Sequence, residues 1–198
     1  ISILDIPDIE RGGSGNPLYD MREGVEFIAR NSIFSFLMGM TFFNSFFGMA
    51  YIFIMPVFAV DILKVGADGQ GMLLAASGLG AVVTTMLLGS ISSTAGRGLM
   101  MIGGAVGFGL SLILFSITSE FHGSFTLALS LMFVLGIANS VYMISIMSTL
   151  QVMVPNRMRG RVMGFYGMTW SLMPLGGMWS GSVANYLGAP FAVSIGGL

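Results

Sequence analysis

Apolar residues fill five long stretches of the chain that contain no Asp, Glu, Lys or Arg. These stretches are residues 31–60, 69–96, 98–119, 121–156 and 162–198. A helix needs roughly 20 residues to cross a hydrocarbon core of about 30 Å, and every stretch is longer than that. The pattern therefore predicts an all-α, polytopic membrane protein.

Within these stretches we place five complete spans and the beginning of a sixth helix. The spans are residues 33–58, 71–92, 99–119, 125–154 and 162–185, and the sixth helix starts from residue 191. The connections are short, so successive helices should be antiparallel neighbours. The run 191–198 is too short to cross a bilayer, and we expect the sixth helix to be truncated here.

The residues before the first span divide into two parts. Residues 1–16 combine charges with a cluster of glycines, which is typical of a cytoplasmic linker. Residues 17–30 carry Leu18, Met21, Val25 and Ile28 at helical spacing, so we predict an amphipathic helix at the membrane interface. A plain solvated linker helix is the alternative. Residues 31–198 form the predicted transmembrane bundle.

Composition excludes several other classes of protein. The chain is 55% hydrophobic and only 9% charged, whereas soluble domains have about 25% charged residues. It has no Cys, a single His122 and a single Lys64, so we expect no metal centre and no cofactor. The net charge of -1 argues against a nucleic-acid partner. No predicted span holds a titratable catalytic set, and we therefore expect a protein that is not an enzyme.

The distribution of basic residues predicts the orientation. If the N-terminal end is cytoplasmic, the outer loops contain only Lys64 and the inner segments contain seven arginines: Arg11, Arg22, Arg30, Arg97, Arg157, Arg159 and Arg161. Basic residues accumulate on the cytoplasmic side of membrane proteins. We therefore predict that the N-terminal end lies inside.

Polar and aromatic side chains recur near the middle of three spans. A polar group at that depth is costly unless it has a partner or meets water, so we predict a cavity between these spans. Its candidate residues are Asn44, Phe47, Tyr51, Asn139, Tyr142, Met143, Tyr166 and Trp170. For either asparagine, a hydrogen bond between two helices is an equally good interpretation. The span at residues 99–119 is nearly devoid of such groups, which favours a peripheral, lipid-facing helix.

Glycine and proline mark further positions in the spans. Pro174, followed by Gly176 and Gly177, predicts a kinked or weakly hydrogen-bonded centre and a candidate hinge, although a tolerated static kink is the commoner case. Three pairs have the spacing that lets helices approach closely, and we expect them to be packing sites. The pairs are Gly103 with Gly107, Gly160 with Gly164, and Gly177 with Gly181.

Two inner loops resemble a known family of transporters. Residues 89–98 resemble the signature loop of the major facilitator superfamily, with matches at Gly89, Gly96 and Arg97. Ser93 stands where the family has Asp, and Gly98 stands at the final basic position. Residues 151–163 are similar to a stretch of the bacterial efflux-type branch, which includes enterobactin-exporter-like and macrolide-efflux-like permeases.

The resemblance implies a twelve-helix permease built of two halves, of which this chain is the C-terminal one and the N-terminal half of the same polypeptide is the partner. It also implies a multi-pass protein of the bacterial inner membrane that exports a small amphipathic or lipophilic molecule by alternating access, driven by an ion gradient. Gly89, Gly96, Arg97, Arg159, Gly160 and Arg161 would then belong to the gating loops. Membrane lipid is a further expected partner.

Two other functions are compatible with the same sequence. One is translocation of a lipid or lysolipid by the same architecture. The other is a transport-dead scaffold whose arginine loops bind a partner or anionic lipid. Polar side chains that converge on one cavity favour transport, because a scaffold has no need of such a cavity.

Overall fold

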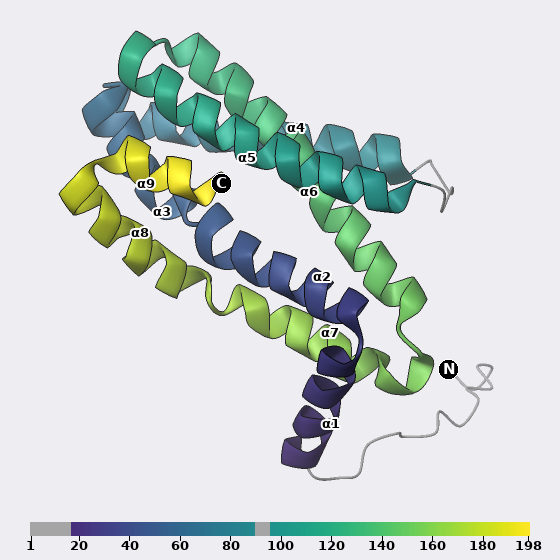
Figure 1. Cartoon of the computed structure of the whole chain (residues 1–198). Coiled ribbons are helices and arrows are strands. Elements are labelled where there is room, and N and C mark those ends of the chain that lie inside the picture. Colours follow the sequence, from purple (N-terminus) through teal and green to yellow (C-terminus); the bar gives the residue numbers. More distant parts are fainter. Residues whose placement is uncertain (1–16, 90–95) are drawn as a thin grey trace, which may run out of the picture.

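The computed structural model describes residues 17–89 and 96–198, and this part of the chain consists of helices without any strand (Figure 1). The predicted linker at residues 1–16 lies outside the described residues. The helices are α1 (Pro17–Arg30), α2 (Ser32–Phe43), α3 (Tyr51–Val57), α4 (Gly66–Gly89), α5 (Arg97–His122), α6 (Phe125–Met153), α7 (Asn156–Trp170), α8 (Met173–Leu187) and α9 (Ala189–Gly196). Two π-helical turns, η1 (Asn44–Gly48) and η2 (Phe58–Ile62), flank α3.

Four helical segments are long and apolar enough to cross a membrane: Ser32–Ile62, Gly66–Leu88, Arg97–His122 and Phe125–Met153. The first joins α2, η1, α3 and η2 into one rod, which extends beyond the predicted end at residue 58. The prediction of an all-α, polytopic membrane protein is confirmed. The segment predicted at residues 162–185 is divided instead into α7 and α8 by Ser171 and Leu172.

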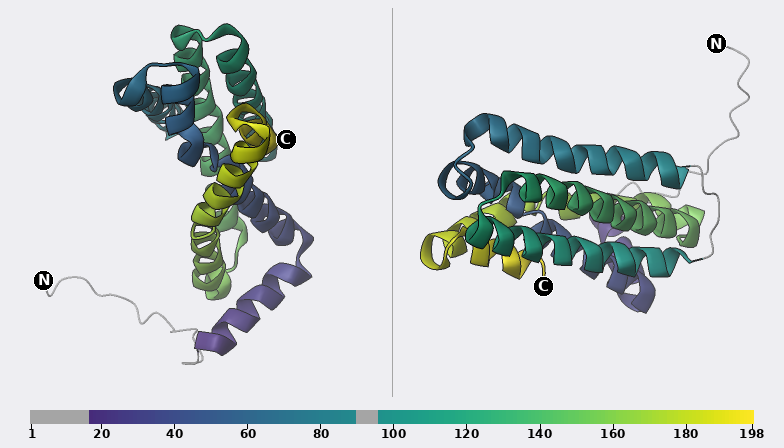
Figure 2. Two further views of the ribbon diagram at one scale, coloured as in Figure 1. Left: turned by 90° about the vertical axis from the view of Figure 1, so that its left-hand side faces the viewer. Right: turned by 90° about the horizontal axis from the view of Figure 1, so that it is seen from above.

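Helix α6 is the centre of the described fold. It packs along α4 on one side and α5 on another, and these three helices, of which α5 is antiparallel to the other two, form one group (Figure 1). The α2–α3 rod and the α7–α8 pair form a second group beside it, and α9 turns back between α5 and α8 (Figures 1 and 2). Helix α1 leaves this bundle at an angle and contacts α2 and α7.

The core has two hydrophobic clusters, and one lies at each end of the bundle. The first joins α3, α4, α5, α6 and α9 around fully buried side chains such as Met55, Phe58 and Phe115. The second joins α2, α6 and α7 around Leu37, Tyr142 and Val162. Many large apolar side chains remain exposed on the outer faces, which is the arrangement expected where lipid is the solvent.

The prediction that the third span is peripheral and lipid-facing is wrong for one of its faces. In α5 the residues Gly104, Phe108 and Leu112 are buried, while Ile102, Val106 and Leu110 are exposed. Helix α4 is the more exposed span. Only 17% of its most apolar 18-residue segment is buried, against 44% of the corresponding segment of α5. Small polar side chains do not distinguish a lipid-facing helix from one that packs through glycine.

Candidate functional site

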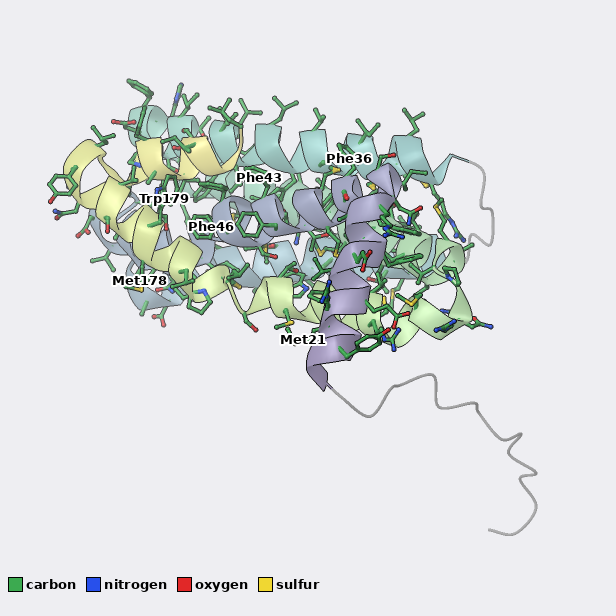
Figure 3. The ribbon with its side chains drawn as sticks, turned by 60° about the horizontal axis from the view of Figure 1, so that its bottom comes forward. Met21, Phe36, Phe43, Phe46, Met178 and Trp179 are labelled. Carbon is green, nitrogen blue, oxygen red and sulfur yellow. The ribbon has the colours of Figure 1, made fainter. Side chains whose placement is uncertain are left out.

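A cavity of about 650 Å³ lies between the α2–η1 segment on one side and α5, α6 and the end of α9 on the other. Its walls are largely apolar. The aromatic side chains follow the helical repeat of α2 and η1, where Figure 3 shows Phe36 and Phe43 along the rod. The lining residues are Phe36, Gly39, Met40, Phe43, Asn44, Phe47, Gly48, Ala105, Phe108, Gly109, Tyr142 and Ile195 to Leu198.

Three of the predicted cavity residues line this space, namely Asn44, Phe47 and Tyr142. The side chain of Phe47 stacks on Phe43, with ring centroids 5.6 Å apart. Tyr142 is only 2% exposed, and its hydroxyl faces Thr41 without forming a hydrogen bond of good geometry to any described residue. The amide nitrogen of Asn44 is likewise buried, with no partner in the described part of the chain. The cavity therefore combines apolar walls with two polar groups that can accept a further partner.

Tyr51 does not reach the cavity. It is buried in the first hydrophobic cluster, where its ring meets Phe108 edge-on at 6.3 Å. The prediction assumed an unbroken α-helix from Asn44 to Tyr51, but η1 closes with a bond from the Met49 N–H to the Asn44 carbonyl. A π-helical turn contains an extra residue. It therefore rotates the following side chains, Tyr51 included, away from the face that Asn44 and Phe47 share.

Met143, Tyr166 and Trp170 lie in the second hydrophobic cluster instead of the cavity wall. The Tyr166 hydroxyl donates a hydrogen bond to the Met143 sulfur at 3.8 Å, which joins α7 to α6. Trp170 packs against the same cluster at the end of α7. The structure thus brings these three residues together with Tyr142, whose side chain belongs both to this cluster and to the cavity.

Asn139 is not a lining residue of the cavity. Its side-chain oxygen is nevertheless buried with no hydrogen-bond partner among the described residues, as is the Ser45 hydroxyl of η1. Asn139 precedes Tyr142 by three positions on α6, which is nearly one helical turn. The choice between an interhelical hydrogen bond and a cavity contact stays a prediction for this side chain.

The cavity also uses residues of α5 that the sequence did not indicate. Ala105, Phe108 and Gly109 form part of its wall. Gly109 lets α9 approach closely, because a Cβ there would collide with the carbonyl of Gly197. The alternation of small and large residues along α5 is the only signal that could have indicated a buried face.

The predicted hinge coincides with a real interruption. The last turn of α7 closes with a bond from the Ser171 N–H to the Met168 carbonyl, and Pro174 occupies the first turn of α8, where a missing N–H is tolerated. Gly176 and Gly177 are close-packing positions, against the Phe46 carbonyl and the Phe53 ring respectively. Motion at the interruption stays a prediction.

The candidate gating residues occupy two separate places. Gly89 ends α4, residues 90–95 lie outside the described part, and Gly96 with a φ of +85° precedes Arg97 at the start of α5. Arg97 lines a second cavity of about 840 Å³ between the ends of α2, α5 and α6. Arg159 and Gly160 are exposed at the start of α7.

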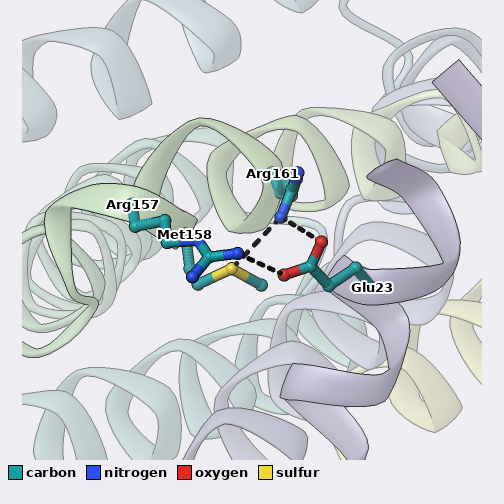
Figure 4. A network of polar contacts seen from close by, with 4 residues as sticks. All are labelled: Glu23, Arg157, Met158 and Arg161. Atoms are coloured by element: carbon teal, nitrogen blue, oxygen red, sulfur yellow. Dashed lines mark hydrogen bonds and ion pairs between the residues drawn. The ribbon is translucent and has the colours of Figure 1, made fainter. Parts of the chain in front are cut away.

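Arg161 is in a contact that the sequence analysis missed. Its guanidinium lies 2.7 Å from the Glu23 carboxylate of α1, and Arg157 lies 3.7 Å from the other oxygen of the same carboxylate (Figure 4). Arg161 also donates to the sulfur of Met158 at 3.4 Å. Glu23 carried no sequence signal, because the partners of a surface-helix charge depend on how that helix packs.

The long apolar helices of this bundle agree with the protein family that the sequence matches. A family model described as the Major Facilitator Superfamily matches residues 37–198. The chain belongs to the Major Facilitator Superfamily. Members of the superfamily are membrane transporters and not, in general, enzymes. The match confirms the membership of this superfamily that the loop motifs indicated. Comparisons with curated proteins and with solved structures gave no match.

Proposed function

We propose that this superfamily member is a secondary active transporter of the bacterial inner membrane. In this proposal it exports a small amphipathic or lipophilic molecule by alternating access, with an ion gradient as the energy source and its N-terminal end in the cytoplasm. The observation that supports the proposal is that three polar side-chain atoms of the predicted cavity residues are buried with no hydrogen-bond partner among the described residues. They are Asn44 Nδ2, Asn139 Oδ1 and Tyr142 Oη.

Unpartnered polar atoms are expensive at this depth. In hydrocarbon no water is available, and an unsatisfied hydrogen-bonding group costs several kcal/mol. A cargo molecule that offers an acceptor to Asn44 or a hydrogen-bonding group to Tyr142 would satisfy these lining residues while it is bound. The polar atoms would therefore form hydrogen bonds to a bound ligand, and the site would still be able to release that ligand.

The walls of the first cavity indicate the kind of cargo. Phe36, Phe43 and Phe47 provide apolar surface, and Met40 adds a flexible side chain that adapts to different shapes. The volume of about 650 Å³ lies within the usual range of small-molecule pockets. A mostly apolar organic molecule with a few polar groups matches this lining better than a sugar or an ion does.

The backbone of the first span supports the same proposal. The π-helical turn η1 begins at Asn44, and such turns inside α-helices are often found at functional sites. It turns Asn44 and Phe47 to the cavity while it sends Tyr51 to the core. Export and gradient coupling rest on the similarity of residues 151–163 to the efflux-type branch.

The test measures efflux of several lipophilic dyes, siderophore-like compounds and a fluorescent lysolipid from cells, with rates normalised to the amount of protein in the membrane. Asn139→Leu and Tyr142→Phe should each change the relative efflux rates of the different compounds at unchanged abundance. Tyr186→Phe, a similar change at an exposed tyrosine, should change nothing.

Three outcomes separate the hypotheses. Altered selectivity among dyes supports export of small molecules, whereas efflux of the lysolipid alone would replace it with lipid translocation. Identical efflux profiles in Asn139→Leu, Tyr142→Phe and the unchanged protein would refute the assignment of these residues to cargo binding. Reduced abundance with an unchanged profile would assign Asn139 to helix packing.

A further inference from the structure

A partly buried ion pair joins helix α1 to the start of α7. The Glu23 carboxylate lies 2.7 Å from the Arg161 guanidinium and 3.7 Å from that of Arg157 (Figure 4). The side chain of Arg161 is 11% exposed and that of Glu23 is 29% exposed, whereas Arg157 is 76% exposed. Glu23 and Arg161 therefore form the sheltered part of the contact, and Arg157 lies at its rim.

The charges of α7 explain why an acidic residue is needed there. This helix begins with Arg157, Arg159 and Arg161 within its first six residues, and its first turn contains no acidic side chain. The N-terminus of a helix carries a partial positive charge, which disfavours nearby cations. The arginines also repel one another. Glu23 supplies the missing negative charge from a different helix.

The two helices also fit closely beside this ion pair. Gly24 follows Glu23, and a Cβ at this position would lie 2.7 Å from the Phe165 ring and 3.3 Å from the Cβ of Arg161. Only a residue without a side chain lets α1 lie directly on α7 here. Tyr19, Met21 and Val25 of α1 remain exposed, and Figure 3 shows Met21 on this helix.

The position of α1 is also linked to the first membrane span. The Asn31 side chain donates to the Phe27 carbonyl, and the Ser35 hydroxyl donates to the Ile28 carbonyl at 2.7 Å, so the corner between α1 and α2 is closed by hydrogen bonds. Helix α2 leads to the cavity face with Asn44. Helix α7 leads to the interruption at Ser171. Helix α1 thus connects the two elements that would move if the cavity changes its opening.

We infer that the Glu23–Arg161 ion pair is a conformational latch, which holds α1 on α7 in the state described here and opens when the protein changes to its other state. This inference rests on the proposed transport function. A charged contact suits the role, because both partners can be solvated at the membrane interface once they separate. An apolar contact of the same size would expose apolar surface to water on opening.

The first experiment follows α1 directly and does not require a cargo. Spin labels are placed on Met21→Cys and Gly160→Cys, two exposed positions in a chain that has no cysteine of its own, and the distance distribution is measured in lipid. Glu23→Gln should shift the ratio of long to short distances by about fivefold, the upper range for a pair of this kind.

Glu26→Gln is the matched control. It removes another α1 carboxylate, whose partner Arg30 lies 2.6 Å away on the same helix, so it should leave the distances unchanged. Equal distributions for Glu23→Gln and Glu26→Gln would overturn the latch whether or not the cargo is known. A shift caused by both variants would assign the effect to the stability of α1.

The second experiment asks whether the latch must open during transport. Glu23→Cys with Arg161→Cys puts one thiol on each helix at the ion pair, and a short, reducible bis-thiol crosslinker can join them. The crosslinked form should transport at least about tenfold more slowly than the same protein after reduction, since α1 is then held on α7 covalently. Equal rates in the two forms would show that α1 does not need to leave α7.

Discussion

Gly136 of α6 packs directly on the backbone carbonyl of Ser77 in α4, and there is no room for a Cβ atom between them. Gly80 in turn packs against the carbonyl of Phe133, and Thr84 lies 3.4 Å from the carbonyl of Ile137. These contacts follow one another along the two helices. Helices α4 and α6 therefore touch at their backbones, which is how small residues hold membrane helices together.

Gly136→Ala should lower the thermal stability of the protein in detergent, because the new methyl group must push the two backbones apart. Overpacking of this kind costs about 1–3 kcal/mol. Gly103→Ala is the control, since no described atom lies within 4 Å of a Cβ built there. It should be neutral or slightly stabilising, because alanine favours the helix more than glycine does. Equal melting temperatures for the two variants would contradict the packing.

Ser116→Ala should loosen the attachment of α9. The buried Ser116 hydroxyl donates to the Pro190 carbonyl and lies 3.2 Å from the Ser194 hydroxyl, so it joins α5 to α9. Hydrogen bonds between membrane helices contribute about 0.6 kcal/mol on average. We expect a small loss of stability and faster hydrogen exchange in α9. Ser130→Ala, which removes an exposed hydrogen bond to the Thr126 carbonyl within α6, should leave α9 unchanged.

Pro174→Ala should change the free energy of unfolding by less than about 0.5 kcal/mol, because this exposed proline lies in the first turn of α8 and breaks no helical hydrogen bond. Gly176→Ala should be far more damaging, since its Cβ would collide with the Phe46 carbonyl. Melting curves of both variants provide the comparison. If Pro174→Ala slows transport at full stability, the interruption between α7 and α8 acts as a hinge.

The orientation of the bundle can be tested with two single cysteines, since this chain contains none. Gly98→Cys lies at the start of α5 and His122→Cys at its end, and both positions are exposed. With the N-terminal end inside, an impermeant thiol reagent should label His122→Cys in intact cells and reach Gly98→Cys only after lysis. The reverse pattern would invert the proposed topology.

The positions of the other glycines show how far sequence spacing can be interpreted. Of the three pairs expected to be packing sites, only Gly107 and Gly177 have a neighbour within 4 Å in the described part of the chain. The closest backbone approaches occur at glycines outside these pairs, such as Gly136 and Gly176. Spacing shows which residues share a face, but the partner helix decides which face is used.

The cavity residues show the same limit on what sequence spacing can predict. The structure places Asn44, Phe47 and Tyr142 on one cavity, and helical periodicity and the cost of mid-membrane polar groups are the local properties that indicated them. Their role in binding cargo stays a prediction. Tyr51 was misplaced because the π-helical turn at Asn44 changes the rotation of the helix. That turn leaves no mark in the spacing of polar and apolar residues.

The sequence by itself determined the class of protein and the approximate length of its spans. The physical reason is that the bilayer acts on each segment separately: any charge-free stretch of sufficient length must become a helix that satisfies its own backbone. Only the tertiary structure decided that Glu23 meets Arg161, that Gly136 meets Ser77 and that α5 borders the cavity. These contacts join residues far apart in the chain, and they depend on how the helices rotate and cross after insertion.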